Sequence, residues 1–189
     1  MRHLRTLAPL ALVAGLMGAC GNGSDSSPSA TDSTLVKSSG GFEIRPVYAR
    51  YAPGVPLGPQ IPQNLTNELQ QQSCPMKPRE LQGMLVECDA GKTVYLLKNP
   101  IVSDDVASAT AKQIGHGNTW YVSVGLNQTG SSSLESVIKD EVGSEIAFSY
   151  GGQVLTSVVV DSSLHPDHLA LIGNFDKAQA TKLAQQVSA

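Results

Sequence analysis

The sequence lacks a hydrophobic run long enough to cross a membrane, and it has few charged residues. Its longest apolar run, Leu7–Ala19, falls short of the roughly 20 residues that a spanning helix needs. Charged side chains make up 15% of the 189 residues and the net charge is −3, so the chain offers neither a basic patch for nucleic acid nor an acidic tail. These absences exclude a nucleic-acid-binding protein.

Residues 1–19 have the organisation of an export signal. Met1–Arg5 carries positive charge, Leu7–Met17 is apolar, and two small residues precede Cys20. The run from Leu16 to Cys20 resembles a bacterial lipobox, in which the cysteine is lipidated, although Met17 stands where leucine is usual. The alternative is a plain secretory signal with a coincidental cysteine. We expect an extracytoplasmic protein held on the bacterial cell membrane, because two acyl chains suffice for stable anchoring.

The segment 20–41 is predicted to be a lipidated cysteine followed by a flexible tether. Gly, Ser, Asp, Thr and Pro dominate it, and such a composition buries too little apolar surface to fold. Removal of Arg2 and Arg5 with the signal lowers the 13 basic residues to 11 against 16 acidic ones, a net charge of −5. The folded domain is expected at 42–189, on a tether whose ends average about 25 Å apart.

Cys74 and Cys88 are the two cysteines that remain once Cys20 is assigned to the lipid. In an exported protein such a pair predicts a disulfide, which in the chain-entropy account stabilises the fold by roughly 3 kcal/mol for a loop of this size. The alternative is two free thiols.

Two strands and a turn are predicted near the C-terminus. Apolar and polar side chains alternate over 145–150 and 153–160. The Gly151-Gly152 pair between them fits a two-residue hairpin loop, because glycine reaches positive φ without a Cβ clash. One face of this hairpin is clearly apolar, and a third short strand at 168–172 follows a polar loop.

The last helix has a clear predicted start. Asp176 is the N-cap, Gln179 is its capping-box partner, and Phe175 is placed to pack against the first turns. One helical face then carries four apolar residues: Ala180, Leu183, Ala184 and Val187. We expect this face to lie on the apolar side of the 145–160 hairpin.

Earlier patterns predict strands at 42–50, 84–88, 93–98 and 119–126 and helices at 64–72 and 132–142, while 103–114 fits either type. Pro46 suggests that the first strand lies at a sheet edge or bends. Ser132 and Glu135 form the predicted capping box of the second helix, whose apolar stripe runs to Val142. Trp120 alternates with apolar residues and is expected on the core side. The fold class is therefore α+β, with a small mixed or antiparallel sheet and two main helices packed on one face.

One loop holds residue types that can bind a metal. His165 and His168, with Asp161 and Asp167 nearby, combine imidazole and carboxylate groups as zinc sites do. Pro166 opposes a helical presentation of the pair, and a structural zinc site usually needs four fixed ligands. We therefore favour a solvated turn, keep these four residues as weak metal candidates, and expect no cofactor.

Catalytic patterns are also weak. No G-x-S-x-G elbow is present, and His116 lies between two glycines without an evident carboxylate partner. Asp104-Asp105 lies in a polar segment where a solvated loop or a helix N-cap is the default. We expect a protein that is not an enzyme.

Several fragments, in order, resemble the head subdomain of the large extracytoplasmic domain of SecD, a component of the Sec export machinery. The fragments are Ile44-Arg45-Pro46-Val47, Cys88-Asp89, Tyr95-Leu96-Leu97 with Pro100, Trp120-Tyr121-Val122, Gly151-Gly152-Gln153-Val154, and Gly173-Asn174-Phe175-Asp176 with Ala180, Leu183 and Ala184. The likeness runs from about Phe42 to Val187. It implies an α+β head fold, and in SecD that head is thought to contact polypeptide emerging from the channel.

The departures from SecD bear on function. Gly151-Gly152 replaces the family's Asp-Gly turn, Thr156-Ser157-Val158 replaces its Ser-Ala-Pro stretch, and the loop at 162–168 has no counterpart that we recognise. No membrane bundle follows the last helix in this sequence, so we expect no proton-driven motor in this chain alone.

Three functional hypotheses follow from these patterns. The first is a non-enzymatic, lipid-anchored binding module that contacts exported polypeptides or an envelope protein near the Sec machinery. The alternative is an envelope lipoprotein that binds a small molecule or a metal through the loop from His165 to His168. A hydrolase with a site that the sequence does not reveal ranks lowest.

Overall fold

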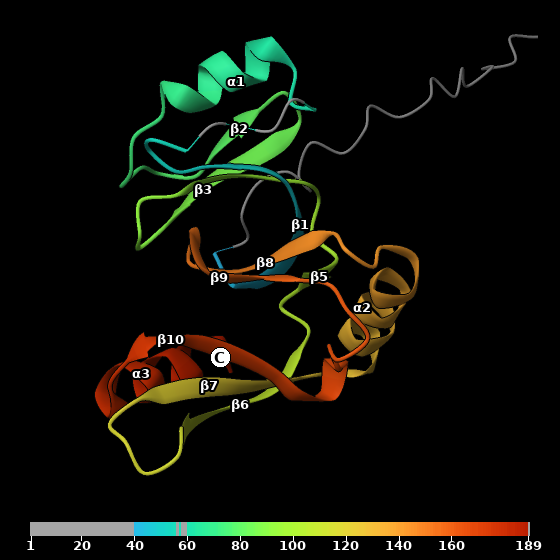
Figure 1. Ribbon diagram of the computed structural model, residues 1–189. Coiled ribbons are helices and arrows are strands. Elements are labelled where there is room, and N and C mark those ends of the chain that lie inside the picture. The colour runs from blue at the N-terminus through green and yellow to red at the C-terminus, as the bar shows by residue number, and fades with distance from the viewer. Residues whose placement is uncertain (1–39, 56, 58–59, 189) are drawn as a thin grey trace, which may run out of the picture. The chain divides into compact units, whose positions relative to one another are not determined.

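The computed structural model describes residues 40–55, 57 and 60–188. The predicted signal sequence, Cys20 and nearly all of the predicted tether lie outside these residues. The elements, labelled in Figure 1, are β1 (Phe42–Tyr51), α1 (Gln63–Gln70), β2 (Arg79–Leu81), β3 (Met84–Asp89), β4 (Val94–Leu97), β5 (Val102–Ser103), β6 (Val106–Gln113), β7 (Trp120–Leu126), α2 (Gln128–Asp140), β8 (Glu145–Tyr150), β9 (Gln153–Val159), the 3-10 helix η2 (Pro166–His168), β10 (Leu169–Phe175) and α3 (Lys177–Val187). Over the described positions, no helix is both long and apolar enough to span a bilayer.

Five strands of the larger sheet close into a ring. The order β3, β4, β1, β8, β9 is antiparallel throughout. A short parallel contact then returns from β9 to β3, with Cys88 beside Gln153 and Asp89 beside Val154. β2 and β5 extend the sheet from β3 and β1. We call β1, β3, β4, β8 and β9 the strand ring.

Side-chain alternation gives the strand ring an inside and an outside. A small cluster lies inside it, formed by Leu85, Tyr95, Leu97, Ala147 and Val154. On the outside of β3 and β4, alternate residues such as Val86 and Leu96 pack with Leu65 and Leu69 of α1. The largest cluster lies on the outside of β1 and β8, where Phe42, Ile44, Ile146 and Phe148 meet the second sheet.

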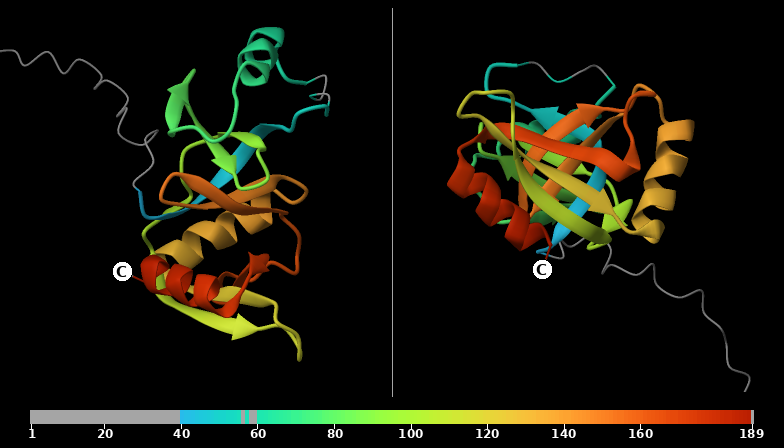
Figure 2. Two further views of the ribbon diagram at one scale, coloured as in Figure 1. Left: turned by 90° about the vertical axis from the view of Figure 1, so that its left-hand side faces the viewer. Right: turned by 90° about the horizontal axis from the view of Figure 1, so that it is seen from below.

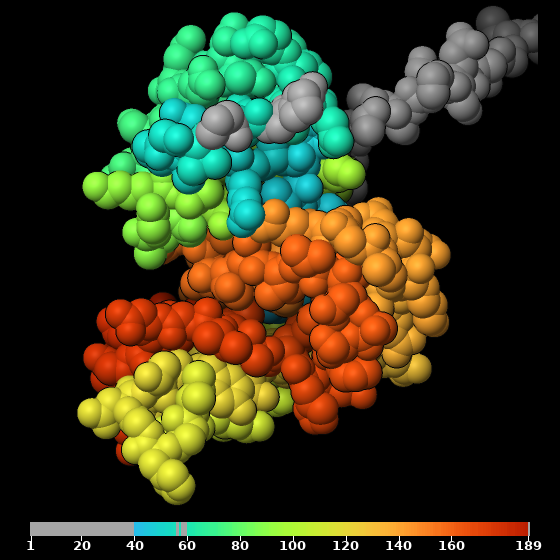
Figure 3. Space-filling view, viewed as in Figure 1, coloured from blue at the N-terminus to red at the C-terminus, as the bar shows by residue number. Residues whose placement is uncertain are grey.

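The second sheet has the order β10-β7-β6 and is antiparallel. We call these three strands the open sheet. The side chains on one face belong to the largest cluster and include Val122, Val124, Leu169 and Leu171. Figure 2 shows α2 and α3 on opposite sides of the open sheet and no element in front of its other face, where Ile172 is 58% exposed. Figure 3 shows an indentation between the surfaces of β9 and β10.

The structure confirms the α+β class with a mixed sheet, and it confirms the main C-terminal features. Gly151 and Gly152 take φ angles of 62° and 80° in the turn between β8 and β9. Asp176 caps α3, and both hydrogen bonds of the predicted capping box with Gln179 are present. The four predicted apolar positions of α3 are buried. The undecided segment 103–114 forms mainly the strand β6.

One expectation about the C-terminal stretch is wrong. The third strand of the stretch is β10, which pairs with β7 and places Leu169 and Leu171 opposite Val124 and Val122. The helix α3 consequently packs mainly on β6 and β7 rather than on the hairpin. The apolar face of the hairpin is covered instead by the open sheet, within the same cluster.

The predicted start of the second helix is also wrong. α2 begins one turn earlier, where the Asn127 side chain accepts a hydrogen bond from the Gly130 backbone N–H at 2.9 Å. Ser132 and Glu135 lie inside the helix, and Val142 lies beyond its end with 68% exposure. Asparagine and serine are equally favourable N-caps, so capping alone does not choose between the two starts. The earlier start brings Gly130 into the helix, where it is buried.

Pro46 is not in an edge strand. β1 pairs with β8 on one side, and on the other side it changes partner from β5 to β4 around Pro46. The missing N–H is tolerated at this change of partner, and the Pro46 carbonyl accepts a hydrogen bond from Lys98 N at 2.9 Å. The strand is visibly curved in Figure 1, as a bend at proline predicts.

Candidate functional site

The metal candidates of the sequence do not assemble into a ligand group. Asp161 accepts hydrogen bonds from the Ser163 hydroxyl at 2.6 Å and the Ser163 N–H at 2.8 Å, and these bonds lower the pKa of its carboxyl. His165 precedes η2 and His168 ends it. Across residues 40–55, 57 and 60–188, no three His, Cys, Asp or Glu side chains are grouped as a metal site would require. The loop is a hydrogen-bonded turn in this structure.

The predicted disulfide between Cys74 and Cys88 is present. It joins the segment after α1 to the end of β3, at the residue of β3 that pairs with β9. Gly152 lies against Pro78 of the same segment so closely that a Cβ at Gly152 would overlap the proline ring. The disulfide therefore fastens the polypeptide between α1 and β2 to the closing point of the strand ring.

A buried ion pair lies inside the strand ring. Arg45 Nε is 2.7 Å from Glu43 Oε2, and both side chains are at most 1% exposed. Arg45 also donates to the carbonyl of Lys98 at 3.0 Å. Sequence reasoning missed this pair, although the signal was present: charged residues at alternate positions of an otherwise apolar strand place both charges on one face.

A second polar group surrounds Tyr95, also on the inward side of the ring. The Tyr95 hydroxyl lies 3.4 Å from Asp89 Oδ2 and 3.4 Å from Ser157 Oγ. Ser157 donates to Glu145 at 2.6 Å, and Arg50 donates to the same carboxylate oxygen at 3.0 Å.

The electrostatics of this group keep the phenol protonated. Burial raises the pKa of Tyr95, and the nearby carboxylates of Asp89 and Glu145 raise it further. The hydrogen bond between Tyr95 and Ser157 and the charge of Arg50 act in the opposite direction. A serine that gives its hydrogen to a carboxylate already paired with arginine is poorly placed as a nucleophile, so the group suits a structural role.

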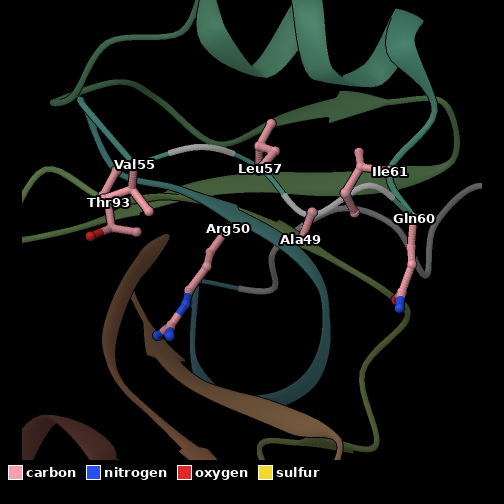
Figure 4. Close-up of a pocket in the computed structure, with 8 residues that line it drawn as sticks. Ala49, Arg50, Val55, Leu57, Gln60, Ile61 and Thr93 are labelled. Atoms are coloured by element: carbon pink, nitrogen blue, oxygen red, sulfur yellow. The ribbon is translucent and has the colours of Figure 1, made fainter.

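A pocket of about 420 Å³ lies between the end of β1 and the segment that leads to α1. Its apolar lining consists of Ala49, Ala52, Val55, Leu57 and Ile61, and Arg50, Gln60 and Thr93 add polar groups. Figure 4 shows Arg50 pointing away from Leu57 and Ile61. The volume falls within the range of small-molecule sites.

The remaining candidates have structural surroundings. His116 is exposed in the turn between β6 and β7. Asp105 accepts hydrogen bonds from the backbone and the side chain of Asn127 through its carbonyl and carboxylate, and so supports the start of α2. Trp120 packs against the largest cluster, as predicted, with the Lys177 ammonium 5.5 Å from the centre of its ring.

Comparison with known proteins agrees with this architecture. Residues 80–189 match the family described as SecDF, P1 head subdomain. A crystal structure of SecDF in its super-membrane-facing form has a TM-score of 0.50 and 19% sequence identity, over 78% of this chain and 18% of that one. A structure of SecDF, described as a membrane component that enhances protein export, gives the same score and identity over 78% of this chain and 61% of that one. Among curated proteins there is no match.

The architecture is thus an α+β domain of the type found within the structures of SecDF. The chain belongs to the family of the SecDF P1 head subdomain, because the family match covers more than half of its length. It spans 18% and 61% of the two SecDF chains, so in each it corresponds to only a part.

Proposed function

We propose that this protein is a non-enzymatic binding module that contacts exported polypeptides, or another envelope protein, near the protein-export machinery. The observation that carries the proposal is its membership of the SecDF P1 head family. One of the SecDF structures is described as a component that enhances protein export, and a head domain of the same fold is suited to a related task. The polar group around Tyr95 agrees with a role that is not catalytic.

We further propose that the module is extracytoplasmic and lipid-anchored through Cys20, which lies outside the described residues. The proposal rests on the apolar segment and the small residues that precede Cys20. Membrane fractionation and intact mass of the wild type and of Cys20→Ser test it. We expect the variant to lose the lipid mass and leave the membrane fraction; equal membrane retention with unchanged mass would refute the anchor.

Site-specific photocrosslinking in intact cells tests the contact with polypeptides. Crosslinkers placed at exposed positions of α1, α2 and α3 should capture exported polypeptides or an envelope protein, and capture should rise when export is slowed. A deletion strain should export marker proteins more slowly. The proposal would be contradicted if no partner were captured and the deletion strain exported marker proteins at the normal rate.

A small-molecule binder is the second candidate, favoured by the pocket in Figure 4 rather than by the His165–His168 loop. A ligand present at 100 times its Kd should stabilise the protein by about 2.7 kcal/mol. Thermal unfolding screened against amphiphilic metabolites would show that shift. An unchanged melting temperature across the screen would remove this candidate.

A further inference from the structure

The outer edge of β6 pairs with no second strand among the described residues, where β6 pairs with β7 alone. The Ile114 N–H donates to the Thr119 carbonyl at 2.9 Å, which sets the alternation of the antiparallel ladder. Thr110 therefore turns its backbone groups toward β7, whereas Ala109 and Ala111 turn theirs outward. Such an edge offers donors and acceptors to an added strand.

A groove of about 560 Å³ runs along this edge, between β6 and α3. The stretch Ala109–Ala111 forms the strand wall. Lys177, Thr181 and Ser188 belong to the helix wall, and their spacing places them on one helical face. The Ser188 hydroxyl reaches the outward carbonyl of Ala109 at 3.5 Å, a long contact that an incoming N–H can replace.

The groove has one positive charge. Among its described lining residues only Lys177 is charged, and its ammonium lies over the ring of Trp120, which also lines the groove. The alanine side chains of β6 leave space on the side that faces α3. The complementary ligand therefore has an extended backbone for the edge of β6 and an acidic group for Lys177.

We propose that an extended polypeptide segment bearing an acidic side chain adds to the outer edge of β6, in the groove between β6 and α3. The inference rests on the proposed function, since it states where the polypeptide would bind. In strand addition, main-chain hydrogen bonds supply affinity and pockets for alternate side chains supply specificity. Here Ala109 and Ala111 provide the main-chain bonds, and Lys177 selects the acidic side chain.

Binding of a short fluorescent peptide to the full chain, measured by anisotropy, tests the mode of binding. The peptide alternates valine and threonine around one central glutamate. N-methylation of alternate residues along one of its edges should weaken binding about tenfold, because it removes hydrogen-bond donors and adds bulk at the junction. N-methylation along the other edge should have little effect. Equal effects on both edges, or none on either, would refute strand addition.

A pair of charge reversals tests the role of Lys177. Lys177→Glu should weaken the glutamate peptide about fivefold and strengthen a version with lysine in its place. Lys182→Glu changes the net charge equally, but Lys182 is exposed on α3 and is not among the lining residues, so it is the matched control. Equal responses of the two variants would overturn the assignment.

The backbone of β6 gives an independent variant. Ala111→Pro removes an N–H that points away from β7, so the β6–β7 ladder should survive, as circular dichroism can verify. Binding of both peptides should fall. Unchanged binding in a folded variant contradicts the proposal, and the N-methylated peptides test the same edge without changing the protein.

Photocrosslinking from Thr181 in the groove and from Gln70 on α1 separates this proposal from the proposed function. Capture of exported polypeptide from Thr181 supports the groove. Capture from Gln70 or from exposed positions of α2, but not from Thr181, refutes the groove and leaves the proposed function standing. Capture from none of these positions, together with normal export in the deletion strain, contradicts both. Crosslinks from Thr181 to the chain itself would show a different occupant, and would therefore overturn the proposal.

Discussion

The strand ring and the open sheet differ in how their backbone hydrogen-bonding groups are paired and how their side chains are covered. The ring closes through the β3–β9 contact, pairs Arg45 with Glu43 in its interior, and is fastened by a disulfide. The open sheet has three strands, one face without cover in Figure 2, and an edge strand beside a groove. The ring therefore supplies rigidity, and the open sheet supplies groups that another chain can engage.

The largest expected effect comes from breaking the ion pair in the ring. Arg45→Ala leaves Glu43 buried without this partner, and loss of one member of a buried pair costs about 3–5 kcal/mol. Denaturant unfolding should show this loss. The control is Arg50→Ala, whose partner Glu145 lies at the same kind of distance, 3.0 Å, but whose side chain is 58% exposed. That variant should lose less than about 1 kcal/mol, and equal losses would contradict the comparison.

Removal of the disulfide should rank next. The double variant Cys74→Ala/Cys88→Ala should unfold with about 3 kcal/mol less free energy, because the open chain gains conformational freedom. Hydrogen exchange should increase first in α1 and β2, since the bond fastens the segment between them. Reduced wild-type protein is the control and should behave as the variant does. If hydrogen exchange increased only in the open sheet, the disulfide would not act on the strand ring, and this would contradict the comparison.

A smaller effect is expected where α3 supports the open sheet. Asp176→Ala removes the acceptor of the Gln179 N–H, which lies 2.8 Å from it, and should cost about 1 kcal/mol. Asp176→Asn retains an acceptor and should stay close to wild type. Thermal unfolding measures both variants. A large loss in the asparagine variant would indicate a role for the charge beyond capping.

The smallest effect concerns pH and the Tyr95 group. The pKa of Tyr95 is raised in the folded protein, so its contribution to stability is present below the ordinary value of 10.0 and is lost as pH rises through the folded pKa. Tyr95→Phe cannot ionise, and its stability should fall less steeply than wild type between about pH 9 and about pH 11. Urea unfolding at both pH values gives the slopes. A variant with the wild-type slope would contradict the raised pKa.

Local features of the fold were predictable because short-range rules determine them. Gly151-Gly152 and the Asp176–Gln179 capping box depend on neighbouring residues only, and both are confirmed. The disulfide followed from the number of cysteines and the expected compartment. The start of α2 was missed because Asn127 and Ser132 are both good caps, and burial of Gly130 decides between them.

Long-range pairing could not be predicted in the same way. Nothing near the strand 168–172 indicates that it joins β7 instead of the adjacent hairpin, since antiparallel partners far apart in sequence have no local signature. The groove beside β6 likewise combines residues around position 110 with residues around 180. The alternation of charged and apolar residues in β1 shows that Glu43 and Arg45 share one face of the strand. That this face is buried depends on closure of the strand ring, which local sequence does not reveal.

The position of β1 determines how the domain would respond to a mechanical load. The chain enters the fold at Phe42, and the strand that begins there is hydrogen-bonded to β4, β5 and β8. A force applied through the N-terminal segment would therefore act first on a strand that is paired on both sides, and bonds on both of its sides would have to break before it could leave the sheet. The edge of β6 lies in the other sheet, which is not hydrogen-bonded to β1.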